Sequence, residues 1–199
     1  MQLKYTKSKI EFEKNLNSLD AFVIDFTKIL NRLGIKYVIV SGYVAILFGR
    51  NRSSEDVDMI VEKIAFEKFK ALWTELDKKF ECIITSDVKE AYEEYLAQKH
   101  AIRFSRKGEY IPNMEIKFPK VELDFWAMGN KKEVLMNENK LYVSPIELQI
   151  PFKLHLGTEK DIEDARYLYA IFKEKMDTEL LNQFNRKLNI IELFNKYLK

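Results

Sequence analysis

The stretch SGYVAILFGRNRSSEDVDMIV, from Ser41 to Val61, decides the expected fold of this chain. It directly follows the end of YVIV, a β-rich run that predicts a short buried strand. YVAILFG predicts a short helix ending at Gly49, and VDMIV predicts a second strand. Two aspartates, Asp56 and Asp58, stand where this second strand is about to enter the core. Their position calls for an explanation, because a buried strand normally begins with apolar residues.

Asp56 and Asp58 are two residues apart, so in a strand their side chains point to the same face, about 6–7 Å apart at the Cα atoms. Val57 and Met59 then face the other way, into apolar packing. Two ionised carboxylates this close repel each other unless a cation lies between them. Mg²⁺ takes oxygen ligands and prefers one or two carboxylates plus substrate phosphates. The pair indicates either a divalent metal site or, taken in isolation, solvated residues between a loop and a strand.

The residues before the aspartates favour the metal site. Ser41-Gly42 forms the turn between a strand and a helix N-terminus, where unpaired N–H groups and the helix dipole attract anions. Arg50 and Arg52 lie in the loop just ahead of the carboxylates and can donate charge-assisted hydrogen bonds to phosphate. A phosphate site and a metal pair in one segment are what phosphoryl or nucleotidyl transfer requires.

This segment resembles the signature of the DNA polymerase β-type nucleotidyltransferase superfamily: a Gly-Gly or Gly-Ser turn, a short helix, then Arg-x-Thr-x-Asp-Ile-Asp. Here Ser54 stands in place of Thr and Val57 in place of Ile, and the hydroxyl of the turn is one position early, on Ser41. The resemblance implies two Mg²⁺ ions, or Mn²⁺, bound by the two aspartates. It also implies phosphate contacts from the turn and the loop, which correspond here to Ser41, Gly42, Arg52 and Ser54.

The same resemblance implies a third carboxylate on a neighbouring strand, which would complete the catalytic and metal-binding set. KVELDFWA is predicted as that strand, with Glu122, Asp124 and Trp126 on one face by period-two alternation. Asp124 is the preferred third acid, and Glu122 is the reserve. The alternative is that Asp124 is a solvent-facing residue of an edge strand.

The stretch FKLHLGTEKDIEDARYL, residues 152–168, resembles a lysine and acidic helix of small nucleotidyltransferase-like proteins, including toxins of abortive-infection systems. The resemblance implies that Lys153 reaches the triphosphate and that Asp161 and Asp164 form part of the site wall. Alternatively, the two aspartates are the solvated start of an amphipathic helix, favoured there by the helix dipole.

The remaining pattern predicts an α/β (α+β) fold: a small mixed β-sheet core over residues 1–143, flanked by helices, and a helical region over residues 144–199 packed on it. HAIRFS, IPNMEIKF and KVELDFWA predict neighbouring antiparallel strands. SPIE, with Ser144, Pro145 and Glu147, predicts a capping box at the first helix of the second region. Further helices are expected from about 159 to 173 and from Thr178 to the end, the latter capped by Asp177.

Composition narrows the class of protein. The 199 residues carry 33 basic and 31 acidic side chains, a formal net charge of +2, which argues against wholesale coating of nucleic acid. A single cysteine, Cys82, excludes an internal disulfide framework. The N-terminal stretch has no apolar signal region and no segment is long enough to span a membrane, so a cytoplasmic protein is expected.

Two functions follow. The first is a Mg²⁺-dependent nucleotidyltransferase that transfers a nucleoside monophosphate from an NTP to a hydroxyl of RNA, protein or a small molecule. The second is a non-catalytic module of the same fold that binds nucleic acid or a partner protein, as in a toxin–antitoxin pair. The altered Ser41-Gly42 turn favours the second function, and the set of three aspartates favours the first.

Overall fold

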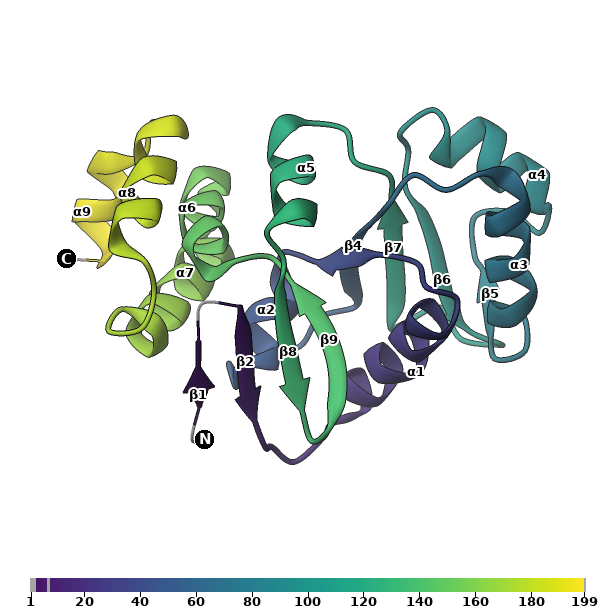
Figure 1. The fold of residues 1–199 in the computed structure, drawn as a ribbon, viewed down its shortest axis with the longest axis horizontal. Coiled ribbons are helices and arrows are strands. Elements are labelled where there is room, and N and C mark those ends of the chain that lie inside the picture. Colours follow the sequence, from purple (N-terminus) through teal and green to yellow (C-terminus); the bar gives the residue numbers. More distant parts are fainter. Residues whose placement is uncertain (1–2, 7, 199) are drawn as a thin grey trace.

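The fold is built on one mixed β-sheet, seen in a computed structural model that describes residues 3–6 and 8–198 (Figure 1). Within these residues the sheet has nine strands in the order β1-β2-β8-β9-β3-β4-β7-β6-β5. Strand β4 lies inside the sheet, antiparallel to β3 on one side and parallel to β7 on the other. This confirms the expected α/β class with a mixed sheet.

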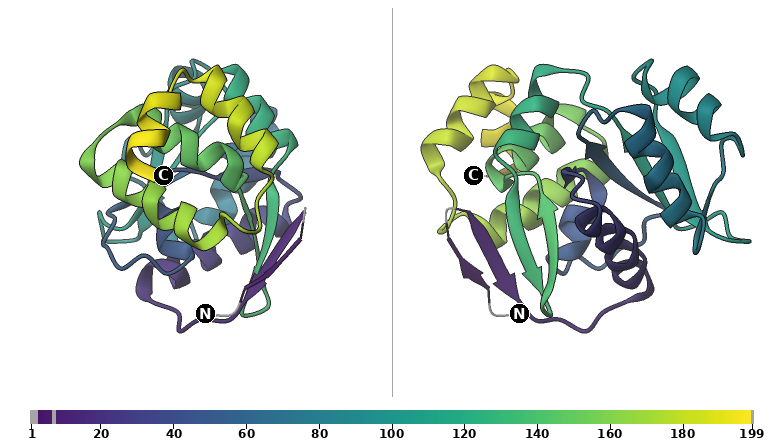
Figure 2. Two further views of the ribbon diagram at one scale, coloured as in Figure 1. Left: turned by 90° about the vertical axis from the view of Figure 1, so that its left-hand side faces the viewer. Right: turned by 45° about the vertical axis from the view of Figure 1, so that its right-hand side comes forward.

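The strands are β1 (Lys4–Tyr5), β2 (Lys9–Phe12), β3 (Tyr37–Ile39), β4 (Asp56–Val61), β5 (Phe80–Cys82), β6 (Ile102–Arg106), β7 (Asn113–Lys117), β8 (Lys132–Met136) and β9 (Asn139–Val143). The helices are α1 (Ser18–Arg32), α2 (Gly42–Leu47), α3 (Phe66–Leu76), α4 (Val88–Glu90), the π-helix η1 (Ala91–Leu96), α5 (Glu122–Gly129), α6 (Ile146–Leu156), α7 (Glu159–Phe172), α8 (Thr178–Lys187) and α9 (Ile191–Leu198). Helices α6 to α9 gather at one end of the molecule, the end at which strands β1 and β2 also lie (Figures 1 and 2).

The stretch from Ser41 to Val61, with the strand before it, folds as the sequence pattern predicts. Strand β3 is fully buried, the chain turns at Ser41, and α2 ends shortly before Gly49. Gly49 has a φ of +103°, a conformation that glycine adopts without the steric cost of a Cβ. Strand β4 then returns antiparallel to β3, with Ile39 opposite Met59. The turn at Ser41 and the start of β4 therefore lie at the same end of these two strands.

The two faces of β4 meet different apolar clusters. Val57, Met59 and Val61 face the main core, which includes side chains from α1, α2 and α3. Ile60, on the other face, joins a smaller cluster with Val38 of β3 and residues of α5, α6 and α8. Because side chains alternate along a strand, Asp56 and Asp58 share the face of Ile60. The aspartates thus lie on the face that the C-terminal helices partly cover.

The prediction of a strand over KVELDFWA is wrong, because residues 122–129 form helix α5. Leu123, Trp126 and Ala127 recur at helical spacing and pack together on the smaller cluster. Val121 and Phe125, which a strand would have turned to the core, are 52% and 61% exposed. Alternation and helical periodicity both fit so short a segment, and tertiary packing selects the helix.

The C-terminal helices differ from expectation in two details. Helix α6 begins at Ile146 without a side-chain cap, so the capping box expected at SPIE is wrong. The last expected helix is two helices, α8 and α9, separated by a turn in which Asn189 has a φ of +55°. The expected cap of α8 is confirmed, because Asp177 accepts hydrogen bonds from the N–H groups of Glu179 and Leu180. Thr158 caps α7 by accepting a hydrogen bond from the N–H of Asp161.

No helix among the described residues has the length and apolar character needed to cross a lipid bilayer.

Candidate active site

Asp56 and Asp58 lie side by side at the start of β4, and both are half-buried. The hydroxyl of Ser54 donates a hydrogen bond to Oδ1 of Asp56 over 3.3 Å. The side chain of Ser41 is hydrogen-bonded to Asp58. Two of the residues expected to contact phosphate, Ser41 and Ser54, therefore hold the two carboxylates.

Burial raises the pKa of Asp58 above its usual range, and the nearby carboxylates of Asp56 and Glu115 raise it further. The Ser41 hydrogen bond and the charge of Lys117 oppose this shift in part. A carboxylate in such surroundings gains when a cation binds beside it, because the cation offsets both the burial cost and the repulsion.

Glu115 is the acid that lies beside Asp58. Strand β7 runs parallel to β4 in a register that places Asn113 opposite Asp56 and Glu115 opposite Asp58. Met114 and Ile116, on the other face of β7, are buried in the main core. The signal was present in IPNMEIKF, where one acid stands between two apolar residues. What was missing from the sequence was the pairing of residues 113–117 with β4.

Arg103 holds Glu115 from the next strand. The two residues are opposite each other in the antiparallel pair β6–β7. Both Nε and Nη2 of Arg103 donate to the same oxygen, Oε2 of Glu115, over 2.9 and 2.7 Å. The hydrogen bond to Glu115 raises the pKa of Arg103, with smaller contributions from Asp56 and Asp58, while burial opposes the shift. The guanidinium therefore fixes one carboxylate oxygen and leaves Oε1 without a hydrogen bond from the described residues.

Asp124 is placed differently from the expectation. It lies in the first turn of α5, where Oδ2 accepts hydrogen bonds from the main-chain N–H groups of Lys120 and Val121 over 2.8 and 3.2 Å. Glu122, the reserve acid, is in the same turn and pairs with Lys187 of α8. This segment forms no strand, and the side chain of Asp124 caps the N-terminus of helix α5.

Arg52 lies directly over the Ser41-Gly42 turn. A Cβ added to Gly42 would come within 2.5 Å of Nη2 of Arg52, so the guanidinium occupies the space that any larger residue would need. The amide of Gln149 on α6 holds the same turn by donating to the carbonyl of Ser41 over 3.1 Å. The glycine thus allows a fixed positive charge to approach the turn next to Asp58.

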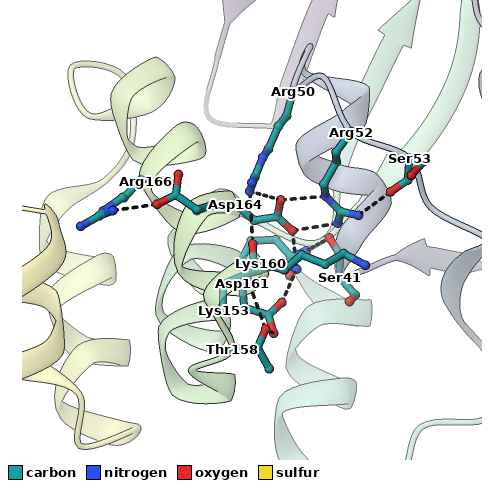
Figure 3. Close-up of polar contacts among 12 residues, drawn as sticks. Ser41, Arg50, Arg52, Ser53, Lys153, Thr158, Lys160, Asp161, Asp164 and Arg166 are labelled. Carbon is teal, nitrogen blue, oxygen red and sulfur yellow. Dashed lines mark hydrogen bonds and ion pairs between the residues drawn. The ribbon is translucent and has the colours of Figure 1, made fainter.

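Asp164 holds this guanidinium in place (Figure 3). Its carboxylate is fully buried and accepts from Nε and Nη2 of Arg52, each over 2.9 Å. It also accepts from Arg50 and, over 2.7 Å, from Lys153. Burial alone would raise the pKa of Asp164, but the bonds from Arg52 and Lys153 outweigh it and hold the pKa below the usual range.

Lys153 is buried, with its ammonium bonded to Asp161 and Asp164, each over 2.7 Å. Arg50, Arg52 and Lys153 together with these two aspartates form what we call the basic cluster. Three positive and two negative charges leave it with a formal charge of +1. The three residues that the sequence pattern singled out in this region, Lys153, Asp161 and Asp164, form one ion-pair network with the arginines of the loop (Figure 3).

Gly42→Ala tests this close approach. The added methyl group would displace Arg52, so we expect the free energy of unfolding to fall by about 1–3 kcal/mol, the usual cost of overpacking. Chemical denaturation measures the loss. Gly129→Ala is the matched control, because a Cβ there meets nothing within 4 Å, and it should leave the stability unchanged or slightly higher.

The donor set fits a hard divalent cation in its chemistry. Asp56, Asp58 and Glu115 all offer oxygen ligands, and the pKa of Asp58 is raised by burial and then by the two nearby carboxylates. Within residues 3–6 and 8–198, no three acidic, histidine or cysteine side chains stand close enough together to hold a metal by themselves. Two aspartates together with substrate phosphates nevertheless suffice for Mg²⁺, which seldom uses an all-protein cage.

Comparison with solved structures places this geometry in a known fold. An antigenic nucleotidyltransferase-like protein from Paracoccidioides brasiliensis matches 92% of this chain and 94% of its own, with 18% identity and a TM-score of 0.50. The chain has the nucleotidyltransferase fold. The lincomycin-bound lincosamide antibiotic adenylyltransferase LnuA matches 79% of this chain and 99% of its own, with 15% identity and a TM-score of 0.52. The antibiotic-resistance factor ANT(2'')-Ia matches 88% and 94%, with 9% identity and a TM-score of 0.51.

These identities are low, so the likeness establishes the fold and leaves the reaction to be argued from the site. Neither a protein-family model nor a curated protein sequence matches the chain. The fold agrees with the resemblance seen in the segment 41–61.

Proposed function

We propose that this protein is a metal-dependent nucleotidyltransferase that transfers a nucleoside monophosphate from an NTP to a hydroxyl group of a small molecule. One observation carries the proposal: Asp56, Asp58 and Glu115 occupy adjacent positions of two paired strands, beside the turn that Arg52 covers. Two of the structural neighbours, LnuA and ANT(2'')-Ia, are named for antibiotics, which are small molecules. The formal net charge of +2 supplies little attraction for an RNA backbone, which favours a small acceptor.

Asp56 and Asp58 would hold Mg²⁺ or Mn²⁺, which when bound neutralises charge on phosphate oxygens and on the attacking oxygen. The chain's own residues supply the rest. Ser41 and Ser54 orient the two carboxylates through their hydroxyl groups. The net positive basic cluster attracts the triphosphate, and Arg52 brings that charge to the turn.

Glu115 would accept the proton of the attacking hydroxyl. Its register beside Asp58 supports this role, and Arg103 orients it by binding a single oxygen. Asp124 is the residue that the sequence pattern favoured for the third position. Asp124 caps the start of helix α5 through Oδ2, whereas Glu115 stands opposite Asp58 on the paired strand, so we assign this role to Glu115.

Glu115→Gln and Asp124→Asn distinguish the two assignments. We expect Glu115→Gln to reduce nucleotidyl transfer by roughly 10²–10⁴-fold, the usual contribution of a general base. Asp124→Asn should reduce it only a few-fold, because it weakens a helix cap outside the acid pair. The reverse ranking would contradict the assignment of Glu115.

The assay incubates the protein with each α-³²P-labelled NTP, Mg²⁺ and a cell extract separated into RNA, protein and small-molecule fractions. Label transferred to the small-molecule fraction supports the proposal. Label found only in RNA or protein would overturn the acceptor class. NTP binding without transfer to any fraction would indicate a non-catalytic module instead.

A further inference from the structure

A small apolar cavity adjoins the candidate active site, on the face of the sheet that carries Asp56 and Asp58. Its volume is about 60 Å³. Helices α5 and α6 form its walls, and its floor belongs to strands β4 and β7 and to the residue that follows β3. Its lining includes Val40, Ile60, Lys117, Leu123, Ala127 and Leu148.

The floor of this cavity begins directly beside the acids. Ile60 follows Asp58 by two residues on β4, so their side chains share a face, with Cα atoms about 6–7 Å apart. Lys117 stands in the same relation to Glu115 on β7, and it is opposite Ile60. Val40 lies beside Asp58, because its N–H donates to the carbonyl of Asp58 over 3.0 Å. A molecule whose hydroxyl group lies at Asp58 and Glu115 can therefore place a neighbouring group in the cavity.

The walls of the cavity select an alkyl group of limited size. Ile60, Ala127 and Leu148 are buried in the smaller apolar cluster, and Leu123 packs against it. A cavity lined by such side chains favours an apolar group over water. A water molecule takes up about 30 Å³ in the liquid, so about 60 Å³ corresponds to two groups of this size, as in an ethyl group.

Lys117 is the polar feature of the cavity that points to a ligand. Its side chain is half-buried, and its ammonium has no hydrogen bond or ion pair with any residue in the ranges 3–6 and 8–198. A lysine ammonium offers three donors and no acceptor. An oxygen that accepts a hydrogen bond is therefore the group that this lysine lacks.

The nearby charges indicate that this oxygen belongs to an uncharged group. A carboxylate there would face the acids of the site, Asp58 and Glu115, and Asp124 of the cavity wall, and like charges this close repel. An ammonium would be repelled by Lys117 and has no lone pair to offer it. A carbonyl, ether or hydroxyl oxygen accepts from Lys117 without either cost.

We propose that this cavity selects the acceptor, and that the acceptor is an uncharged molecule with an ethyl-sized alkyl group next to a carbonyl, ether or hydroxyl oxygen. The alkyl group lies over Ile60, and Lys117 donates to the oxygen. The role in transfer rests on the proposed function, whereas binding to the cavity does not.

Propionamide, propionate and propylamine test the chemistry of the site, because they share an ethyl group and differ in charge. Each is titrated without NTP or Mg²⁺ into protein with ¹³C-labelled leucine methyl groups. We expect propionamide to shift the signals of Leu123 and Leu148 saturably and to bind at least about fivefold more tightly than the two charged probes. Leu193, an exposed leucine of α9 outside the lining, should not respond. Absent shifts, or equal or tighter binding of a charged probe, would overturn the proposal.

Lys117→Met tests the donor. This substitution keeps most of the apolar stem and removes the ammonium, so propionamide should bind at least about fivefold more weakly. Lys120→Met is the matched control, because Lys120 is exposed and lies outside the cavity lining, and it should bind like the parent protein. Equal affinities of the two variants would refute the contact with Lys117.

Ala127→Val tests the place of the alkyl group. Two added methyl groups fill the cavity from the α5 wall, so binding of propionamide should again fall at least about fivefold. Ala71→Val on α3 carries the same change at an exposed helical position and should bind like the parent protein. Unchanged binding by Ala127→Val would place propionamide elsewhere and refute the site.

α,β-Methylene-ATP with Mg²⁺ tests the assignment to the acceptor. We expect it to leave the affinity for propionamide unchanged, because the triphosphate is assigned to the Ser41-Gly42 turn. Competition between the two would assign the cavity to the nucleotide and overturn the acceptor role. Binding of propionamide by a protein that transfers no label would retain the cavity as a ligand site and refute only its role in transfer.

Discussion

Replacing Asp58 by asparagine is expected to reduce nucleotidyl transfer on the order of a thousandfold. A bound metal ion contributes several kcal/mol to stabilising the charge of the transition state, and each 1.4 kcal/mol corresponds to a tenfold change in rate. Asp58 lies between Asp56 and Glu115, so its loss removes the central acid of the site. Transfer of label from α-³²P-NTP in the presence of Mg²⁺ measures the effect.

The same substitution is expected to stabilise the metal-free protein near neutral pH. The pKa of Asp58 is raised in the folded state, so the folded protein holds this proton more tightly than the unfolded chain does. Below the ordinary pKa of aspartate, both states are protonated and the residue imposes no cost. As the pH rises through the raised pKa, the parent protein loses stability that Asp58→Asn retains. The stability difference should therefore appear with rising pH and then level off.

Thermal unfolding with and without Mg²⁺ separates these effects. A ligand that binds only the folded state raises its stability, so Mg²⁺ should raise the melting temperature of the parent protein but not that of Asp58→Asn. Asp77→Asn is the matched control, because Asp77 is 62% exposed and pairs only with Lys107 in the described structure. A variant with full activity, or with the same response to Mg²⁺ as the parent, would refute the assignment of Asp58.

The largest loss of stability is expected for Asp164→Asn. The carboxylate of Asp164 is fully buried and compensates Arg50, Arg52 and Lys153 at once. Removing one partner of a buried ion pair leaves uncompensated charge and typically costs about 3–5 kcal/mol. Because Asp164 joins α7 to the loop before β4, we also expect Arg52 to lose its fixed position over the Ser41-Gly42 turn.

The stability difference between the parent protein and Asp164→Asn should depend on pH in the direction opposite to that of Asp58→Asn. The pKa of Asp164 is lowered in the folded state, so its stabilising contribution is complete above the ordinary pKa of aspartate and disappears as the pH falls through the lowered value. Urea unfolding at pH 7 and at acid pH measures both parts. Glu163→Gln is the matched control: Glu163 is the adjacent residue, 46% exposed and paired with Arg166, and it should change the stability by less than about 0.5 kcal/mol. Equal losses for the two variants would contradict the role of Asp164.

The part of the site that could be predicted from sequence is the part that is local. Ser41, Gly42, Asp56 and Asp58 belong to one strand-turn-helix-loop-strand segment, whose order follows from periodicity and glycine positions. Arg52 was also found, because it lies in the same loop. The position of its guanidinium group could not be predicted, because it depends on Asp164, which lies 112 residues later in the chain.

The third acid shows most clearly what could not be predicted from the sequence. Glu115 and Asp124 stand in similar apolar surroundings in the sequence, and period-two alternation fits both segments. Only strand pairing distinguishes them: β7 lies next to β4, whereas residues 122–129 bury Leu123, Trp126 and Ala127 at helical spacing. Choosing between a helix and a strand of this length requires knowing which surface is available to bury.

The local pattern of hydrophobic residues, turn residues and charges was therefore enough to determine the fold class, the paired aspartates and the turn beside them. The tertiary structure alone decided which acid joins them and which carboxylate holds Arg52. The reason is physical: periodicity along the chain sets which way a side chain points, but its partners are set by register and packing between segments far apart in sequence.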